Sequence, residues 1–456
     1  MAEVQAAARD WSGAKALFRL EASLLGAATF AAGAVPRLLP LLLGLLGLAA
    51  VIHVFTTART RLLDYAREPV FIALLVFLAY VFINATWSPD PGEGMAKAAT
   101  TLGLSAAVLF LAASFSLRDA REVRVLATSA LAGLLLGVGF LLIELLFDEP
   151  IARFVNNHIV QLFDVSPKKI KTANGEVVKI AASVLNRNAT GVVLLLIPCL
   201  LLTTALSTTR ARRASLVVLI GFAAAAVLLS ESGTSIVAFF AGGFVLALAA
   251  LSLKLARSVL IAAWTAATLL AVPLGALPYT LGWHHWTWLP PESVAARFYI
   301  WKYVADRVPE KPITGIGIRG TRALHLVIPT DAGDPSHKEF ALKGRAARHP
   351  HNIYLQTWLE LGAIGAVLLL VLGLTGLWQM RALAPPVEGS AYGLFAVSSM
   401  VGFSGFDLWQ TWLLASAALA WAVILLAARL PGAVFSRESI AGEDHRRKAV
   451  SPDPRA

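Results

Sequence analysis

The sequence predicts an all-α polytopic integral membrane protein with about twelve transmembrane helices. Of its 456 residues, 57% are hydrophobic and only 15% are charged, and its mean hydropathy is +0.69. Soluble domains carry about 25% charged residues, and a soluble chain could not bury so much apolar surface. The apolar residues also form runs of about 20 residues, the length that spans a bilayer as a helix.

Twelve such runs follow one another along the chain, and each predicts a transmembrane helix. They cover residues 17–35, 37–56, 69–87, 95–115, 123–146, 184–206, 213–230, 232–250, 257–281, 353–377, 389–406 and 408–427. Residues 1–456 are therefore expected to form a single membrane domain.

Basic residues cluster in every second short connection, and this asymmetry predicts the orientation of the chain. Cytoplasmic loops carry an excess of Lys and Arg. With a cytoplasmic N-terminus, the inner connections hold most of the basic residues, among them Arg59, Arg61, Arg67, Arg118, Arg121, Arg124, Arg210, Arg212 and Arg213. Both termini are thus predicted to be cytoplasmic. Much of the net charge of +11 comes from such anchors, so it does not indicate a nucleic-acid partner.

Two longer segments, 147–183 and 282–352, fall on the outer, periplasmic side. Both are rich in Lys and Arg, with ten basic residues in 282–352 alone. Long translocated segments tolerate basic charge, and loops on a rigid scaffold often carry function. We expect residues 282–352, the large loop before the tenth helix, to carry the active site. For residues 147–183 two roles stay open, a lid over the active site or a contact for the acceptor substrate.

A surface helix is predicted over residues 290–312 of the large loop. Phe298, Trp301, Ala305 and Val308 recur at helical spacing, but the run is too short and too polar to span a membrane. Arg297 lies within this helix. It has two interpretations, as a ligand for an anionic substrate or as a contact for lipid headgroups.

The sequence GIGIRG at residues 315–320 matches the pattern G-x-G-x-x-G. A dinucleotide site would need a strand before it and a helix after it, and neither is predicted in this loop. The glycines instead predict a tight turn that brings the backbone close to a neighbour or a ligand. Arg319, in this turn, is a candidate substrate contact, and no nucleotide is expected.

Two histidines stand at the entrance of the tenth helix, in the stretch RHPHN at residues 348–352. An H-x-H pair such as His349 and His351 can bind a metal, but the ligand set around it is thin, so no metal is expected. A neutral histidine can instead take a proton from a hydroxyl group. Arg348, His349 and Asn352 are candidate substrate contacts beside His351.

A third candidate site opens the sixth helix, in the sequence LNRN at residues 185–188. An arginine at a membrane entrance is costly unless it is paired or faces a polar cavity. A helix N-terminus with Asn186, Arg187 and Asn188 favours an anion, and guanidinium groups match phosphate oxygens in pairs. Glu144, Glu360 and Asp407 lie near the same membrane face, either as functional acids or as structural partners of arginines.

These residues resemble a known family. His351-Asn352, nine residues, then Gly362-x-x-Gly365 is similar to the signature of bacterial O-antigen ligases and the related O-antigen polymerases. The segment ARFYIWKYVADRVPEKPITGIGIRG and the arginine of LNRN also resemble that family. The resemblance implies a membrane glycosyltransferase fold of the GT-C type in the bacterial inner membrane, with its active site on the periplasmic side.

The resemblance further implies the reaction and its residues. Family members transfer a glycan from an undecaprenyl-diphosphate donor, and ligases place it on a sugar hydroxyl of lipid A–core. No metal, nucleotide or other cofactor is implied, because the donor is already activated. His351 would be the general base, and Arg297 and Arg187 would hold the diphosphate as it leaves. Gly362 and Gly365 would serve helix packing.

Two alternatives to the ligase remain open. A polymerase of the same family would transfer the glycan to another lipid-linked glycan. A transporter for lipid-linked glycan would bind the diphosphate without breaking a bond. Transporters of the inverted-repeat type show broken helices at matching places in two halves, and no such repeat is visible in the sequence. Besides the two substrates, membrane lipids are the expected partners.

Overall fold

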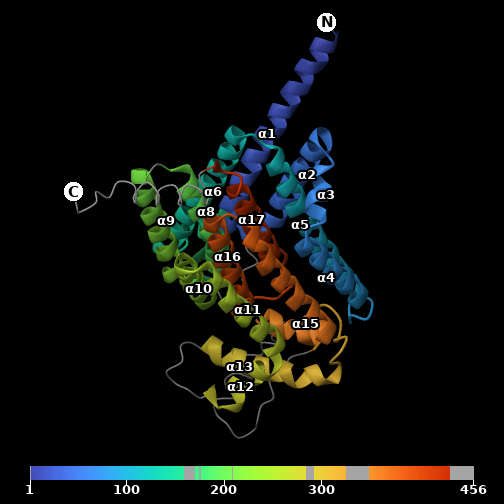
Figure 1. Ribbon diagram of the computed structural model, residues 1–456. Coiled ribbons are helices and arrows are strands. Elements are labelled where there is room, and N and C mark those ends of the chain that lie inside the picture. Colours follow the sequence, from blue (N-terminus) through green and yellow to red (C-terminus); the bar gives the residue numbers. More distant parts are fainter. Residues whose placement is uncertain are drawn as a thin grey trace, which may run out of the picture.

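The computed structural model describes residues 2–158, 170–173, 176–207, 209–283, 292–324 and 349–431. They form a bundle of helices, with α12 and α13 at one end (Figure 1). The helices are α1 (Ala2–Ala34), α2 (Leu39–Thr57), α3 (Arg61–Ala66), α4 (Pro69–Ala85), α5 (Pro91–Leu117), α6 (Ala120–Leu146), α7 (Pro150–His158), α8 (Asn186–Leu206), α9 (Thr209–Leu229), α10 (Gly233–Leu251), α11 (Leu253–Leu269), α12 (Ala271–Thr280), α13 (Glu292–Arg307), α15 (Ile353–Gln379), α16 (Pro385–Ser404) and α17 (Thr411–Ala427).

The expected multi-pass helical membrane architecture is confirmed. Within the described residues, seven helices are long and apolar enough to cross a membrane, or eight if the bent pair α11 and α12 forms one span. Two further apolar helices, α4 and α17, have 17 residues each. Every one of the twelve predicted runs coincides with helix, but the number of twelve spans stays a prediction.

The run 257–281, predicted as one helix, is instead two helices bent by 74° between α11 and α12. The break lies at Leu270, three residues before Pro273. Proline has no N–H to donate to the carbonyl four residues earlier, and its ring collides with that carbonyl. The sequence of this run therefore ends α11 and redirects the chain toward α13.

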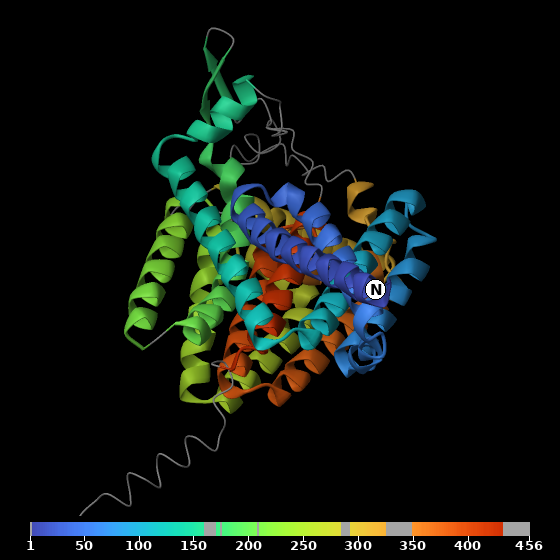
Figure 2. The same ribbon diagram turned by 90° about the horizontal axis from the view of Figure 1, so that it is seen from above.

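The expectation of an all-α chain also needs one correction, in the segment 147–183. Strands β1 (Ile170–Ala173) and β2 (Glu176–Ile180) pair antiparallel and lie with α7 at the rim of the bundle (Figure 2). The residues between them are Asn174-Gly175, the pair typical of a hairpin turn. On α7, the Asn157 amide binds both backbone groups of Val177 in β2, at 3.0 and 3.1 Å.

Helix α8 is the most enclosed of the candidate spans, with 78% of its apolar window buried. It packs against α1, α6, α9, α16 and α17. Gly191 permits a close approach to α1, because a Cβ atom there would lie 2.0 Å from the carbonyl oxygen of Ala32. In addition, the Asn188 amide donates to the carbonyls of Gly33 and Ala34, at 3.0 and 2.6 Å. The first turn of α8, which carries Arg187, is thus held firmly in place.

Helix α15 is interrupted at Gly362, where φ is 67° and ψ is −165°. This conformation is accessible essentially only to glycine, so Gly362 serves the backbone and not the helix packing that was expected. The loop that contains Gly315 and Gly317 enters the gap. Ile316 and Gly317 donate to the carbonyls of Leu359 and Glu360, at 3.0 and 2.9 Å. The tight approach predicted for GIGIRG is confirmed: a Cβ atom on Gly315 would lie 2.3 Å from the Glu360 carbonyl oxygen.

Side chains predicted on the same side of the membrane lie together at the same helix ends. Arg61, Ser116 and Arg429 line a polar pocket at the C-terminal ends of α2, α5 and α17. Pro40, Lys97 and Thr411 line another pocket at the N-terminal ends of the same three helices. The alternation of loops predicted from the sequence is therefore consistent with the fold.

Replacing Gly362 by alanine should destabilise the protein. The alanine Cβ would lie 2.3 Å from the Ile313 carbonyl oxygen, and the backbone conformation alone costs roughly 1–3 kcal/mol for other residues. We expect a clearly lower melting temperature in detergent. Gly243→Ala is the matched control, because a Cβ there meets no atom of the described structure within 4 Å. Equal melting temperatures for the two variants would contradict the role assigned to Gly362.

Candidate active site

The segment before α15 is fixed from both sides. On its N-terminal side, the indole Nε1 of Trp301 in α13 donates to the carbonyl oxygen of Pro350, at 2.8 Å. On its C-terminal side, the buried Asn352 caps α15, and its Oδ1 accepts from the backbone N–H groups of Tyr354 and Leu355, at 3.0 and 3.1 Å. Asn352 thus has a structural role that the sequence analysis did not foresee. His351 lies between these two anchors.

His351 is held as one tautomer. Its Nδ1 lies 2.7 Å from the carbonyl oxygen of Gly405, and because a carbonyl can only accept, Nδ1 must carry the proton. Burial and the charge of Arg297 lower the pKa of His351, against the opposing effects of the Gly405 carbonyl and Asp407. The ring is therefore neutral near pH 7, and its Nε2 carries a lone pair that can take a proton. Its backbone has φ of 55°, an uncommon conformation outside glycine that often marks functional positions.

His349 packs against His351, with ring centroids 4.0 Å apart. Burial lowers the pKa of His349 to about 2, and the neighbouring His351 and the positive charges of Arg322, Arg319 and Arg297 act in the same direction. Its Nδ1 is buried and has no hydrogen-bond partner among the described residues. The two rings thus form one neutral imidazole pair beside several arginines.

Arg297 lies in α13, the helix predicted for this loop. The sequence predicted that the apolar face of this helix would lie on the membrane surface. Instead, Phe298, Trp301, Ala305 and neighbouring Val308 are buried within the protein, where α13 packs against α12 and α15. Burial lowers the pKa of the Arg297 guanidinium, which remains charged. Its positive charge acts on both histidines, so Arg297 lies beside the imidazole pair.

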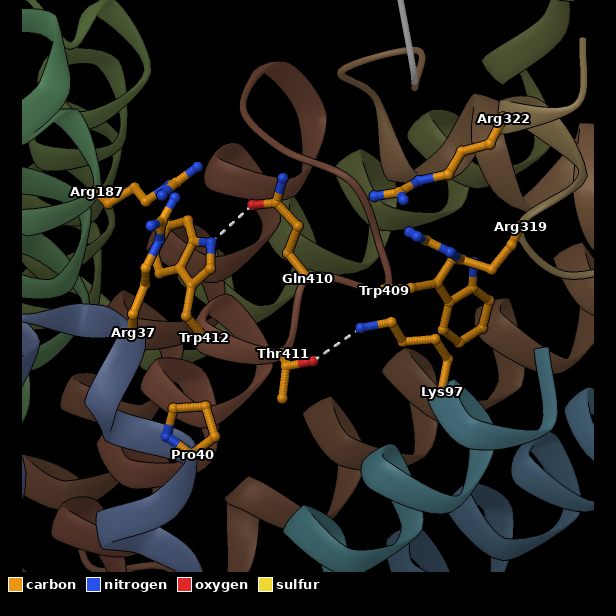
Figure 3. A pocket seen from close by; sticks show the side chains of 10 residues that line it. All are labelled: Arg37, Pro40, Lys97, Arg187, Arg319, Arg322, Trp409, Gln410, Thr411 and Trp412. Atoms are coloured by element: carbon orange, nitrogen blue, oxygen red, sulfur yellow. Dashed lines mark hydrogen bonds between the residues drawn. The ribbon is translucent and has the colours of Figure 1, made fainter. Parts of the chain in front are cut away.

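A pocket of about 300 Å³ opens near the first turns of α2, α5, α8 and α17, and we call it the basic pocket. Five cationic side chains line it: Arg37, Lys97, Arg187, Arg319 and Arg322. In Figure 3 their ends point toward a common space, with Arg37 and Arg187 on one side and the other three opposite. The remaining lining residues include Trp409, Gln410 and Trp412. Such a pocket suits an anion.

Arg187 is in the first turn of α8, as predicted, and it reaches into the basic pocket over the ring of Trp412, 5.9 Å from the ring centroid. Asn186 precedes it, and the buried Asn186 Oδ1 has no hydrogen-bond partner within the described part of the chain. Arg297 is not among the residues that line this pocket. The two arginines expected to act together therefore belong to two neighbouring clusters.

Arg319, expected as a substrate contact, is paired with carboxylates. Its Nη1 lies 2.7 Å from Oδ2 of Asp407, and its Nη2 contacts Glu93. Arg319 is 5% exposed and Asp407 is 1% exposed. The guanidinium borders the basic pocket, but these two carboxylates largely compensate its positive charge. Asp407 is thus the structural partner of an arginine, one of the two alternatives that the sequence left open.

The buried carboxylate of Glu360 joins the same network. It accepts from the backbone N–H and hydroxyl of Thr321, at 3.2 and 2.6 Å, and from the indole of Trp409, at 2.6 Å. Gln356 bridges the two acids: its Nε2 lies 3.2 Å from Glu360 Oε1 and 2.8 Å from Asp407 Oδ1. The network ties α15, the loop after GIGIRG and the loop before α17 into one unit.

The loop between α16 and α17, residues 405–410, connects the two clusters. At one end of this loop, the Gly405 carbonyl accepts a hydrogen bond from Nδ1–H of His351. At the other end, Gln410 lines the basic pocket, and the adjoining Thr411 accepts a hydrogen bond from Lys97 Nζ at 3.2 Å. Asp407, between them, is fixed by Arg319 and Gln356. A substrate in the basic pocket would therefore lie close to the histidines.

Three basic residues of the pocket were missed by the sequence analysis: Arg37, Lys97 and Arg322. Arg37 is a basic residue in a short outer connection, which the positive-inside rule disfavours, and this exception was a signal. Lys97 begins a predicted span, and Arg322 follows GIGIRG. Arg348 lies outside the described residues. Within the described residues, no three His, Cys, Asp or Glu side chains form a group suited to a metal ion.

The fold and this site define a multi-pass helical membrane protein with a histidine and arginine site near one end of its bundle. Comparison with known proteins agrees with that class. Residues 200–370 match the family model described as O-Antigen ligase. A "putative polysaccharide ligase" of Rickettsia conorii is 32% identical over 139 residues, which are 29% of this chain and 31% of that protein. Another, of Rickettsia typhi, is 28% identical over 200 residues, 43% of this chain and 47% of that protein.

These matches confirm the predicted resemblance to the O-antigen ligase family. The chain spans about a third to a half of the length of the curated relatives it matches. The matched range 200–370 contains Arg297, Arg319, His349 and His351, whereas Arg187 lies before it.

Replacing Arg319 by glutamine should cost stability and not only substrate affinity. The substitution leaves the buried Asp407 without its paired cation and Glu93 with Arg322 alone, and breaking a buried pair costs roughly 3–5 kcal/mol. We expect a large drop in melting temperature without any substrate present. Arg307→Gln removes an exposed pair with Glu310 and should cost about 0–1 kcal/mol. A variant at Arg319 that melts like wild type would show that the network does not depend on this arginine.

Proposed function

We propose that this protein is a glycan ligase that transfers a glycan from an undecaprenyl-diphosphate donor to a sugar hydroxyl of lipid A–core. One observation carries the chemistry: the Gly405 carbonyl accepts a hydrogen bond from Nδ1–H of the buried His351, so the lone pair of the neutral ring lies on Nε2. A glycosyl transfer to a hydroxyl needs such a base. The match of residues 200–370 to the O-Antigen ligase family supports this class of reaction.

In the proposed reaction, Nε2 of His351 takes the proton of the acceptor hydroxyl. The hydroxyl oxygen forms a bond to the anomeric carbon of the donor glycan, and the bond from that carbon to the diphosphate oxygen breaks. The electron pair of the broken bond stays on the diphosphate. The products are the glycosylated acceptor and undecaprenyl diphosphate, and His351 returns its proton to solvent.

Arg187 and Arg297 would stabilise the negative charge that develops on the leaving diphosphate. Preorganised charges in a site that excludes water are often worth several kcal/mol in the transition state. Arg187 lies in the basic pocket and Arg297 lies beside the histidines. We infer that the reacting bond lies between these clusters, with the acceptor at His351. His349 would support His351 by packing, and Asn186 and Arg348 would contact substrate.

The proposed setting is the bacterial inner membrane, with twelve spans of the GT-C type and both termini in the cytoplasm. Residues 282–352 would then lie in the periplasm and carry the active site, and 147–183 would be a second periplasmic segment. The grouping of predicted inner and outer residues at opposite helix ends supports the alternation of the loops, and the excess of basic residues in the inner connections supports their cytoplasmic side.

A transfer assay tests the proposal. Purified protein in lipid is given the undecaprenyl-diphosphate glycan and lipid A–core, and the products are separated on a gel. Wild type should produce glycosylated lipid A–core. His351→Ala should reduce the rate by at least about 10²-fold, the lower range for the loss of a general base, while donor binding remains.

On the same gel, the fate of the lipid-linked donor distinguishes the ligase from the polymerase and the transporter. Longer lipid-linked chains without glycosylated core would replace the ligase by a polymerase. Unchanged donor in the presence of folded wild-type protein would argue against both enzymes and favour a transporter.

A further inference from the structure

Two successive carbonyl groups at the end of α16 have different hydrogen-bond partners. The Gly405 carbonyl accepts from Nδ1–H of His351 at 2.7 Å. The carbonyl before it, that of Ser404, accepts from the hydroxyl of Thr234 in α10 at 2.9 Å. The last carbonyls of a helix have no intrahelical donors, so the Thr234 hydroxyl satisfies a group that α16 itself leaves open.

The methyl group of Thr234 contacts the same turn. A Cβ atom on Gly405 would lie 2.9 Å from Cγ2 of Thr234 and 2.5 Å from the carbonyl oxygen of Val401. Only a glycine at 405 therefore lets α10 approach the turn this closely. Thr234 thus restrains both residues of the turn, Ser404 through its hydroxyl and Gly405 through its methyl group.

Thr234 is itself held in a fixed position. It is 5% exposed and lies in the first turn of α10. The Oγ of Ser232 caps this turn by accepting from the backbone N–H of Ser235 at 3.3 Å. The hydroxyl of Ser235 lies 3.0 Å from that of Thr190 in α8, and α10 packs against both α8 and α16. The turn that carries Thr234 is therefore anchored to two neighbouring helices.

We propose that Thr234 is a positioning residue for His351: its hydroxyl orients the Ser404–Gly405 peptide and thereby the Gly405 carbonyl that fixes the His351 ring. A peptide group is planar, so a bond to the Ser404 carbonyl sets the orientation of the whole plane that leads into Gly405. Thr234 acts through this turn and not on a substrate. The inference rests on the proposed function for the role of His351 as the general base.

Replacing Thr234 by valine should release the turn. Valine resembles threonine in shape but has no hydroxyl, so the Ser404 carbonyl would lose its donor. An acceptor left unpaired inside a protein costs free energy, and the peptide is expected to rotate toward another donor. That rotation would turn the Gly405 carbonyl and lengthen its hydrogen bond with His351.

Two measurements on Thr234→Val in the full-length protein in lipid test the proposal. In nitrogen-15 NMR of protein labelled at histidine, the Nδ1–H signal of His351 should shift and broaden relative to wild type. In the transfer assay, kcat should fall roughly twofold to tenfold, the rate equivalent of one hydrogen bond, while KM for each substrate stays within about twofold of wild type.

Two further variants serve as controls. Thr234→Ser keeps the hydroxyl and should retain both the wild-type signal and the wild-type kcat. Thr203→Val removes a buried hydroxyl that donates to the Cys199 carbonyl at 2.7 Å in the last turn of α8, and it should leave both quantities unchanged. Melting curves confirm that each variant is folded, and Thr234→Ala repeats the test if Thr234→Val does not fold.

Four results would overturn the role of Thr234: an unchanged His351 signal in Thr234→Val, an unchanged kcat despite a shifted signal, an equal change in Thr203→Val, or no recovery in Thr234→Ser. The two proposals can also fail separately. A shifted signal in Thr234→Val together with no glycan transfer by wild type would refute the proposed function and leave the positioning of His351 standing. Normal transfer with an unchanged signal in Thr234→Val would do the reverse.

Discussion

The site depends on two buried carboxylates, Glu360 and Asp407, and on the groups that satisfy them. Between them they accept hydrogen bonds from the side chains of Arg319, Gln356 and Trp409. An unpaired charge in such a position would cost several kcal/mol. The network therefore holds together only when α15, the loop after GIGIRG and the loop before α17 are all in place. His351 directly precedes α15, and Arg322 and Gln410 of the basic pocket lie in the two loops.

The need to bring the loop through GIGIRG against α15 explains why α15, a candidate membrane-spanning helix, is interrupted. Gly362 interrupts α15 so that the loop through Gly315 and Gly317 can bind the exposed carbonyls. Asn84 of α4 links this loop to α15. Its amide group donates to the Thr314 and Glu360 carbonyls, and its Oδ1 accepts from the backbone N–H of Ile318. Irregular backbone at membrane depth is tolerated when protein groups satisfy it. The loop through Gly315 and Gly317 is thereby joined to α15 and α4 by hydrogen bonds.

Local patterns predicted much of this arrangement. Apolar runs located the helices, the spacing in 290–312 located α13, and the glycines of GIGIRG indicated a close backbone approach. The Asn174-Gly175 signal of the hairpin was present in the sequence and was overlooked. The break at Gly362 was not predictable locally, because its cause is a loop about fifty residues earlier. Lys97 was missed for the same reason, since only packing of distant helices brings it beside Arg187, whereas Arg37 had a local signal as a basic residue in an outer connection.

The central claim is that the Gly405 carbonyl fixes the tautomer of the buried, neutral His351, so that its lone pair lies on Nε2. Nitrogen-15 NMR of protein labelled at histidine tests it most directly, with the His351 signals assigned by their loss in His351→Gln. At neutral pH we expect a protonated Nδ1 and an unprotonated Nε2. A proton on Nε2, in either the other tautomer or the imidazolium, would contradict the assignment of His351 as the general base.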